Sequence, residues 1–481
     1  MATIGKSISL RGLCIYDKIG QSCVVGHSAI SGKVSLSNLG DSWQSKHHVS
    51  AAKELFHFVK PLMVERRAIA ELLASAGRLL LEYNESTGNI HRSLTATASA
   101  LTRDKLEVSV HYGGVLISIG DDPPEFTPIK ELRYNATLQA RVHSILDDVR
   151  RGKLDVASAL AKLQHAETTT PRHPRAVAVV VLGIAAAALA AILGADWSAI
   201  LTVGISSALG LFARQELGRR HFALLTLPLV AAFLGAVFGG IAIRMGWTYT
   251  PALVLVVPSL MLVPGPHLIN GLLDLMDNYL PMSLARLGLA TSILTASALG
   301  IVLGMELTIF GPAASDQSFG TAHLNLISDM FLAGVVTCGF AMFYNASWPQ
   351  IGMAIVGGMI GHGLRYVALE AGCRLEVATF VGSIAVGVIA AFIARNYKTP
   401  FAVIAFAGAV TMMPGLQMYR ALGGALQLAH TKTAAESSLV AGALGNALQA
   451  SFTVAALALG LVLGLRIISI FTRKSANVAV Y

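Results

Sequence analysis

Long apolar runs occupy most of residues 176–466, and they constrain the fold more than any other feature of the sequence. A helix needs roughly 20 apolar residues to cross a bilayer. By this measure about ten of the runs can be drawn as membrane segments, although two of them are too short to cross alone. Only 13% of all residues are charged, about half the share that is usual in soluble domains. The sequence therefore predicts an α-helical polytopic membrane protein.

The region before the apolar runs carries many of the charges and reads as an α+β domain. Residues 106–120 alternate in polarity around a Gly-Gly pair, which predicts two strands joined by a turn. Residues 131–164 have apolar positions at helical spacing and predict two helices separated near Gly152. No spacing of cysteine, histidine or acidic residues is typical of a metal site, so we expect neither a metal nor a cofactor.

The membrane region reads as two copies of one pattern. Trp197 and Trp348 open corresponding segments, and Pro264-Gly265 corresponds to Pro414-Gly415 after segments too short to cross alone. Five segments per copy is an odd number, so the second copy enters the membrane upside down. This arrangement, two inverted repeats of five transmembrane segments, is typical of secondary transporters.

Basic residues at segment ends gather on the side of the N-terminus, which the positive-inside rule assigns to the cytoplasm. We therefore expect the N-terminal α+β domain and the C-terminus to be cytoplasmic. The expected division is a disordered extension over 1–48, the cytoplasmic domain over 49–170, the first repeat over 176–310, the second repeat over 324–468, and a cytoplasmic tail over 469–481.

The two Pro-Gly pairs predict two helices that break at membrane depth. Proline removes a backbone donor and glycine adopts conformations that end helices. A half-helix that restarts there presents free amides and a positive dipole end, which suit a carboxylate. The alternative is that both pairs only kink helices for packing. We favour a substrate site at and after both breaks, formed by Pro264, Gly265, His267, Asn270, Pro414, Gly415, Gln417, Tyr419 and Arg420.

Three ionisable residues are candidates for proton coupling, because ionisable groups inside a membrane region tend to mark function. They are Asp274, Asp277 and His362. A solvated acidic helix surface is the simpler interpretation of Asp277, and a hydrogen-bonded packing role fits His362 equally well. Arg365, one turn after His362, is expected at the outer interface. Arg420 lies almost two turns beyond its proline, so it either binds the substrate or reaches the interface.

Four stretches of the chain resemble the threonine/serine exporter family. AGRLLLEYNESTGNIHRSLTATASAL and LRYNATLQARVHSILDDVRRGKLDVASALAKL are similar to its cytoplasmic domain, and MLVPGPHLINGLLDLMDNYLPMSLARLG and MMPGLQMYRAL to its membrane domain. The resemblance implies export of threonine and serine, driven by the proton gradient. Many members have a short run of small residues (Ser/Gly-Ala-Ser/Thr) where this chain has Tyr-Asn-Glu-Ser at residues 83–86. A ligand-binding role of that turn in the family therefore does not transfer to this chain.

We predict a secondary transporter in the bacterial inner (plasma) membrane, not an enzyme. Its expected partners are a small-molecule substrate (an amino acid or a small carboxylate), protons and the lipid bilayer. Assembly into a homo-oligomer is left as an open alternative. Nucleic acid is not expected despite a net charge of +9, since basic residues here orient helices and meet anionic lipid.

Three alternatives stay open. A related two-chain family is associated with dicarboxylate export. A membrane-anchored hydrolase is disfavoured by the repeat and by the lack of a nucleophile–base motif. A channel is disfavoured by the broken helices, which favour alternating access.

Overall fold

A computed structural model describes residues 65–308, 324–397, 401–430 and 437–478. The chain divides into two compact units. One, called the α+β unit, consists of Met1–Leu81, Asn89–Lys130 and Ser144–Thr168; the other, the membrane unit, consists of Glu82–Gly88, Glu131–His143 and Thr169–Tyr481. Two short pieces of the N-terminal region therefore belong to the membrane unit. The expected extension over 1–48 lies outside the described residues.

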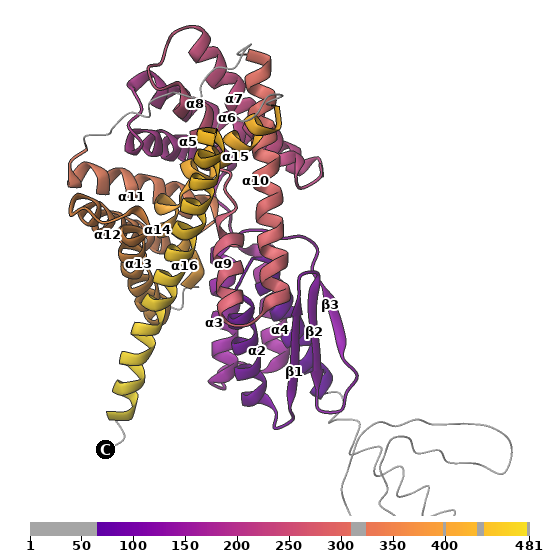
Figure 1. The fold of residues 1–481 in the computed structure, drawn as a ribbon. Helices are drawn as coiled ribbons and strands as arrows, with labels where there is room; N and C mark the ends of the chain where they lie inside the picture. Colours follow the sequence, from indigo (N-terminus) through magenta and orange to yellow (C-terminus); the bar gives the residue numbers. More distant parts are fainter. Residues whose placement is uncertain (1–64, 309–323, 398–400, 431–436, 479–481) are drawn as a thin grey trace, which may run out of the picture. The chain divides into compact units, whose positions relative to one another are not determined.

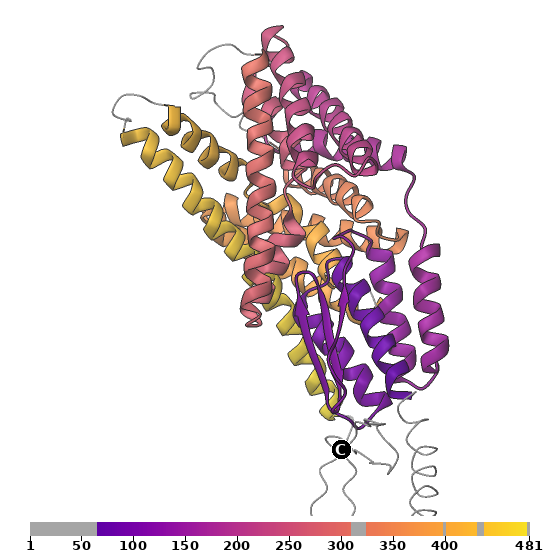
Figure 2. The same cartoon turned by 90° about the vertical axis from the view of Figure 1, so that its right-hand side faces the viewer.

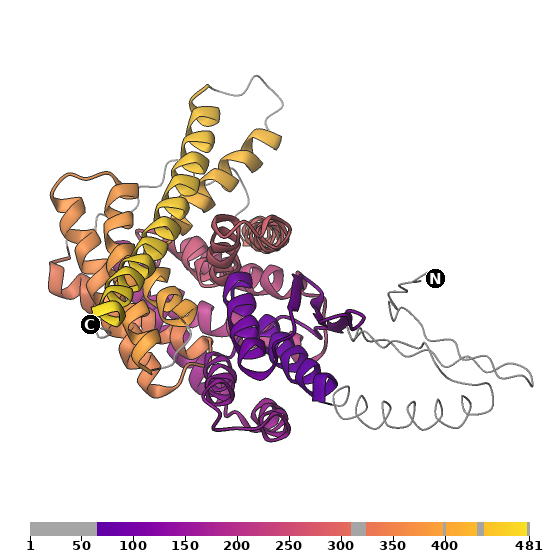
Figure 3. The same cartoon turned by 90° about the horizontal axis from the view of Figure 1, so that it is seen from below.

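The α+β unit contains a three-stranded antiparallel sheet in the order β1-β2-β3, with helices on one face (Figure 1, Figure 3). The predicted strand pair is confirmed, with Leu106 opposite Ile119 and His111 opposite Gly114. The third strand was not predicted, because it is short and follows a Pro-Pro pair. The elements of the chain before the membrane helices are a helix over 65–82, α2 (Thr87–Leu101), β1 (Leu106–His111), β2 (Gly114–Ile119), β3 (Glu125–Pro128), α3 (Ala136–Arg150) and α4 (Val156–Thr169). The first half of α3 belongs to the membrane unit.

Side-chain burial alternates along β2, and the buried side chains lie on the face of the sheet that the helices cover. Val115, Ile117 and Ile119 are buried, because every second side chain of a strand points to the same face. The predicted pair of helices is also confirmed as α3 and α4, and Gly152 lies between them with a positive φ of 67°.

Helices make up the described part of the membrane unit. Eight of them are long and apolar enough to cross a membrane, or nine spans if the bent pair α8–α9 is counted as one, which confirms a polytopic helical membrane protein. The helices are α5 (Arg175–Ile192), α6 (Trp197–Arg219), α7 (Thr226–Arg244), α8 (Pro251–Leu260), α9 (Gly265–Met276), α10 (Leu280–Thr308), α11 (Leu326–Phe343), α12 (Trp348–Glu370), α13 (Leu375–Tyr397), α14 (Phe401–Ala409), η1 (Val410–Met412), α15 (Gly415–His430) and α16 (Ser437–Val478).

Eight of the ten expected segments correspond to the eight long helices, and the two short ones correspond to α8 and to α14 with η1. Trp197 and Trp348 begin α6 and α12, as predicted. The expected tail starting at 469 is a continuation of α16 as far as Val478.

Packing partners recur between the two halves of the membrane unit. In the first half α5 packs on α6, α7 on α10, and α9 on α10; in the second half α11 packs on α12, α13 on α16, and α15 on α16. Figure 2 shows α15 running beside the first part of α16. This recurrence fits a repeat, whereas the inverted orientation of the second copy stays a prediction.

A repeated glycine pair explains the tightest of these contacts. A Cβ on Gly304 of α10 would lie 2.8 Å from the carbonyl oxygen of Phe233 in α7, and a Cβ on Gly464 of α16 would lie 2.6 Å from that of Ile384 in α13. Small residues four apart let two membrane helices approach backbone to backbone. The motifs ALGIVLGM and ALGLVLGL therefore serve the same packing role in each half.

Asp196 connects the start of α6 to the segment before α8. Its carboxylate accepts hydrogen bonds from the amide of Ala199 (3.2 Å), the hydroxyl of Thr248 (2.8 Å) and both the amide (3.0 Å) and hydroxyl (2.7 Å) of Thr250. Partial burial opposes ionisation, but hydrogen bonds from Ser198, Thr250 and Thr248 outweigh it, so the pKa of Asp196 lies well below its ordinary value.

Candidate functional site

Both Pro-Gly pairs break a helix where the sequence predicted. The helix α8 ends at Leu260, α9 begins at Gly265, and the two axes differ by 60°. In the second half η1 ends at Met412 and α15 begins at Gly415. Each new half-helix therefore starts at the glycine of its pair.

The two breaks pack against one another. Gly265 lies against the ring of Phe406 in α14, so closely that a Cβ would overlap it, and a Cβ on Gly415 would lie 2.6 Å from Leu260 in α8. Thus α9 packs on α14, and α8 packs on α15. The two broken helices therefore meet, and their depth in the bilayer stays a prediction.

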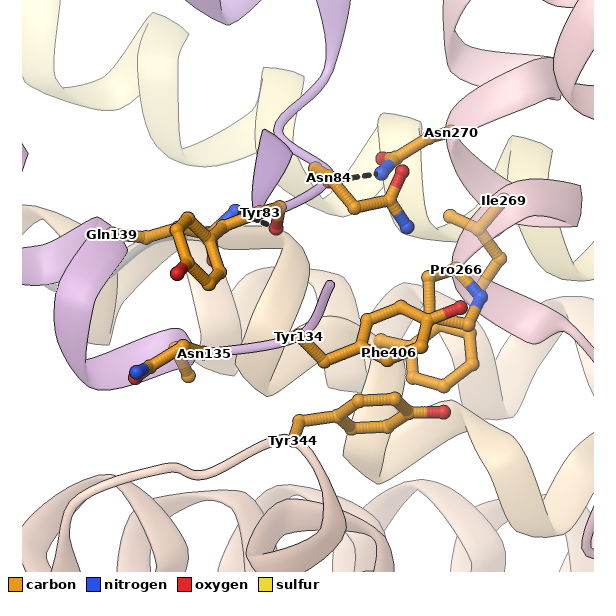
Figure 4. A pocket seen from close by; sticks show the side chains of 11 residues that line it. Tyr83, Asn84, Tyr134, Asn135, Gln139, Pro266, Ile269, Asn270, Tyr344 and Phe406 are labelled. Carbon is orange, nitrogen blue, oxygen red and sulfur yellow. Dashed lines mark hydrogen bonds between the residues drawn. The ribbon is translucent and has the colours of Figure 1, made fainter. Parts of the chain in front are cut away.

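A small pocket with a mostly apolar lining lies beside the first break. Its volume is about 30 Å³, enough for one or two water molecules but not for an amino acid. The rings of Tyr134 and Phe406 both pack edge-on to Tyr344, with centroids 5.2 and 5.0 Å away (Figure 4). The lining residues are Tyr83, Asn84, Tyr134, Asn135, Ala136, Gln139, Pro266, Ile269, Asn270, Tyr344 and Phe406.

A buried ion pair joins α9 and α10 next to this pocket. Arg286 Nε lies 3.1 Å from Asp274 Oδ2, with both side chains almost fully buried. Asp274 also accepts hydrogen bonds from the amide and hydroxyl of Thr87, each at 2.9 Å. Arg286 donates to Asn84 Oδ1 (2.7 Å) and to the carbonyl of Glu85 (2.6 Å). We call these five residues the Arg286 cluster.

The cluster uses the turn in which the sequence departs from many relatives of the resembled family. Asn84 has a φ of 66°, a left-handed conformation that asparagine tolerates better than most residues. Its carbonyl accepts a hydrogen bond from Asn270 Nδ2 at 2.7 Å, drawn in Figure 4. Glu85 in turn lies 3.1 Å from the ring of His143. The turn therefore serves as a docking element for α9 and α10.

Two predicted substrate ligands are buried beside the small pocket. His267 packs with its ring centroid 6.1 Å from that of Tyr134. Within the described part of the chain, His267 Nδ1 and Asn270 Oδ1 have no hydrogen-bond partner. Unsatisfied buried polar atoms are costly, and the pocket has room for a bridging water.

A second, larger cavity of about 290 Å³ lies between the two breaks. Its walls come from α5, α8, α11, α12, η1 and α15, and most of the lining is apolar. The polar and ionisable residues of the lining are Asp329, His362, Arg365, Tyr366, Glu370, Thr411 and Gln417. Its volume is at the lower end of the range for small-molecule sites.

A chain of polar contacts runs along one wall of this cavity. Arg365 Nη1 lies 3.3 Å from His362 Nε2, and His362 Nδ1 lies 2.7 Å from Asp329 Oδ2. A guanidinium only donates, so Nε2 must accept, and Nδ1–H donates to the carboxylate. Arg365 Nη1 is also 3.5 Å from the carbonyl of Thr411. Arg365 Nε and Thr411 Oγ1 are buried without a hydrogen-bond partner in the described residues.

The structure divides the predicted substrate residues between two places. Pro264, Gly265, His267 and Asn270 lie at the first break or beside the small pocket. Gly415 and Gln417 line the larger cavity, which begins just after Pro414. Arg420 is exposed, and the side chain of Tyr419 lies outside the described residues.

The predicted proton-coupling residues also separate. Asp274 belongs to the Arg286 cluster, and His362 lines the larger cavity. Asp277 is partly exposed and lies 3.5 Å from the exposed Arg466, which agrees with its interpretation as a helix surface residue.

Sequence reasoning missed Asp329, Thr411 and Arg286. Asp329 lies in the first turn of an apolar segment, and an acidic residue inside such a segment was the signal that should have singled it out. Arg286 was interpreted only as a basic residue at a segment end. Arg365 lines the cavity, and its expected place at the outer interface stays a prediction.

Comparison with known proteins adds two family matches. Residues 71–308 match the family model described as "Putative threonine/serine exporter", and residues 329–467 match the one described as "Threonine/Serine exporter, ThrE". The "Probable succinate transporter subunit YjjP" of Escherichia coli (strain K12) is 22% identical over 251 residues, 51% of this chain and 96% of that protein. Its counterpart from Klebsiella aerogenes is 22% identical over 247 residues, 50% and 95% of the two chains. No solved structure matches the chain.

Proposed function

The chain belongs to the threonine/serine exporter family, and from this premise we propose that it is a proton-coupled secondary transporter that exports threonine and serine across the bacterial inner membrane. Substrate binds between the two broken helices, and both termini lie in the cytoplasm. The observation that carries the proposal is the reciprocal packing of the breaks, α8 on α15 and α9 on α14.

Reciprocal packing suits alternating access. Helices that are broken at membrane depth free backbone groups that need protein or a wet cavity to satisfy them. The cavity of about 290 Å³ that carries ionisable residues adjoins both breaks, whereas the pocket beside Asn84 of the Arg286 cluster measures only about 30 Å³. Such an asymmetry is what one state of a two-state carrier would have, with its site accessible on one side at a time.

In this proposal the Arg286 cluster closes the cytoplasmic side. Thr87, Asn84 and Glu85 tie one turn to α9 and α10 through buried, charge-assisted contacts, which are among the stronger hydrogen bonds in proteins. Opening towards the cytoplasm requires this turn to leave α9 and α10. We therefore assign Asp274 to closure and leave proton exchange to His362, while Asp277 is assigned to the helix surface.

Counterflow in proteoliposomes tests the proposal. Vesicles loaded with unlabelled threonine are diluted into trace labelled threonine, and a carrier produces a transient overshoot of label inside. A hydrolase gives no uptake, and an open channel gives uptake without overshoot. An imposed pH gradient should then drive threonine and serine against their concentration gradients, and a gradient without effect on the wild type would exclude proton coupling.

The dicarboxylate alternative is favoured by one observation, the names of the two YjjP proteins, which are those of succinate transporter subunits. The same vesicles loaded with succinate decide between the substrates. Succinate counterflow without threonine counterflow would replace the amino-acid proposal by the dicarboxylate one.

A further inference from the structure

We infer that the larger cavity is the substrate site, that Arg365 binds the carboxylate of the amino acid there, and that His362 carries the proton exchanged for it. The inference rests on the proposed function and names the residues that perform it. The pocket of about 30 Å³ is too small for an amino acid, whereas the cavity of about 290 Å³ can hold a small one. A third cavity of about 550 Å³ also reaches both breaks, but no ionisable residue is among its described lining residues.

The cavity also holds polar atoms that lack a hydrogen-bond partner among the described residues. Arg365 Nε and Thr411 Oγ1 are buried without a partner among the described residues, a cost that a bound carboxylate would remove. The first turn of α15 begins at Gly415 on the same cavity, and the first amides of a helix have no partner within the helix. Guanidinium fork, hydroxyl and helix amides together form a carboxylate site.

The charges of the lining decide the substrate class. Among the described lining residues there is one guanidinium, that of Arg365, against the carboxylates of Asp329 and Glu370. A dianion such as a dicarboxylate would bring a second negative charge without a second cation. A zwitterion brings an ammonium group that these carboxylates attract. The cavity therefore selects a zwitterionic amino acid over a dicarboxylate.

Because Arg365 contacts His362, a proton on His362 and a substrate carboxylate on Arg365 cannot be bound at the same time. Nε2 of His362 accepts from Arg365 at 3.3 Å while Nδ1–H donates to Asp329 at 2.7 Å. A proton taken up from water at Nε2 converts this contact into a repulsion between two cations, and Arg365 moves away from its carboxylate-binding position. Loss of that proton to water restores the site. Mutually exclusive occupancy is what an antiporter needs.

The surroundings of His362 leave few other groups to titrate with it. Besides His362, the ionisable groups of the cavity lining are Asp329 from α11 and Arg365, Tyr366 and Glu370 from α12, and of these Asp329 and Arg365 contact its ring. The helix α13 meets this part of α12 through Gly382 and Val386 at Gly361. Of the remaining walls, η1 and α15 contribute Thr411 and Gln417, which do not titrate, and α5 and α8 contribute only apolar side chains.

Threonine binding to the purified full-length protein in nanodiscs tests the carboxylate assignment. Arg365→Gln should weaken binding roughly tenfold to hundredfold, Arg365→Lys should restore only part of it, and the exposed Arg374→Gln serves as the matched control. Wild-type affinity in Arg365→Gln and Arg365→Lys would overturn the assignment. If Arg365→Gln does not fold, the lysine variant and Thr411→Val decide in its place. Loss of binding in Arg420→Gln alone would move the carboxylate site to that residue.

The proton assignment has its own readout. Wild-type affinity for threonine should fall as the pH is lowered through the titration of His362. His362→Gln, which keeps an acceptor and a donor but cannot bind a proton, should bind threonine with little dependence on pH. If His362→Gln keeps the wild-type pH profile of threonine binding, His362 does not carry the proton. If the wild type binds succinate more tightly than threonine, the assignment of a zwitterionic substrate is wrong. A wild type that neither binds nor exchanges threonine refutes the proposed function instead.

Discussion

Arg286 and Asp274 form an ion pair at 3.1 Å, and their side chains are only 2% and 1% exposed. Burial of two charges is costly unless both are fully paired. Here the carboxylate also accepts from Thr87, and the guanidinium also donates to Asn84 and Glu85. The pair therefore depends on a turn far away in the sequence, and that dependence makes it sensitive to substitution.

Asp274→Asn should destabilise the protein by about 3–5 kcal/mol, because it leaves Arg286 charged and buried. Asp277→Asn is the matched control: Arg466 is 62% exposed, and surface pairs contribute about 0–1 kcal/mol. Denaturant unfolding in detergent micelles measures both. Equal stability of the two variants would contradict the role given to the Arg286 cluster.

Gly265→Ala should damage the packing of the two breaks, since its Cβ would overlap the ring of Phe406. Overpacking of this kind costs about 1–3 kcal/mol, and Phe406→Leu in the same chain should recover part of it. Gly423→Ala is the control, because no atom lies within 4 Å of the Cβ it would add. Threonine counterflow and the yield of folded protein report the effect. A single variant that behaves like the control would show that the breaks need no close contact.

Asp196 should make stability depend on pH only in acid. Its folded-state pKa is below the ordinary value, so its contribution is present in full above about pH 4, the pKa in an unfolded chain, and is lost as the pH falls towards the folded pKa. The difference in unfolding free energy between wild type and Asp196→Ala, about 1–2 kcal/mol for a lost helix cap, should be constant from pH 6 to 8 and shrink below about pH 4. A difference that grows in acid would have the wrong sign.

Reporter fusions test the inverted repeat. Fusions after Thr170 and after Tyr481 should both report the cytoplasm, and a reporter inserted between α10 and α11 should report the outside. The charge bias at the segment ends predicts this arrangement. Termini on opposite sides would mean an odd number of crossings and would remove the inverted repeat.

The sequence predicted the positions of the breaks and the helix starts well, because their causes are local. Proline and glycine act on their own backbone, and Trp197 and Trp348 follow polar capping positions at Asp196 and Ser347.

The partners of buried charges could not be predicted in the same way. Arg286 and Asn84 are 202 residues apart, and no local pattern indicates that they touch. Asp329 and His362 also come from different helices, 33 residues apart. Periodicity shows which face of a helix is buried, but it does not show which charged side chains of two faces meet.

The assignment of Glu82–Gly88 to the membrane unit limits how this protein can be dissected. A clone that begins at Thr169 would look, from hydropathy, like the complete membrane half. It would lack Asn84, Glu85 and Thr87. Arg286 would then stay buried with Asp274 as its only remaining partner in the Arg286 cluster. The N-terminal region therefore contributes to the structure of the membrane unit. If a truncated protein without it is inactive, the loss of activity reflects a missing structural part and is no evidence that the region regulates transport.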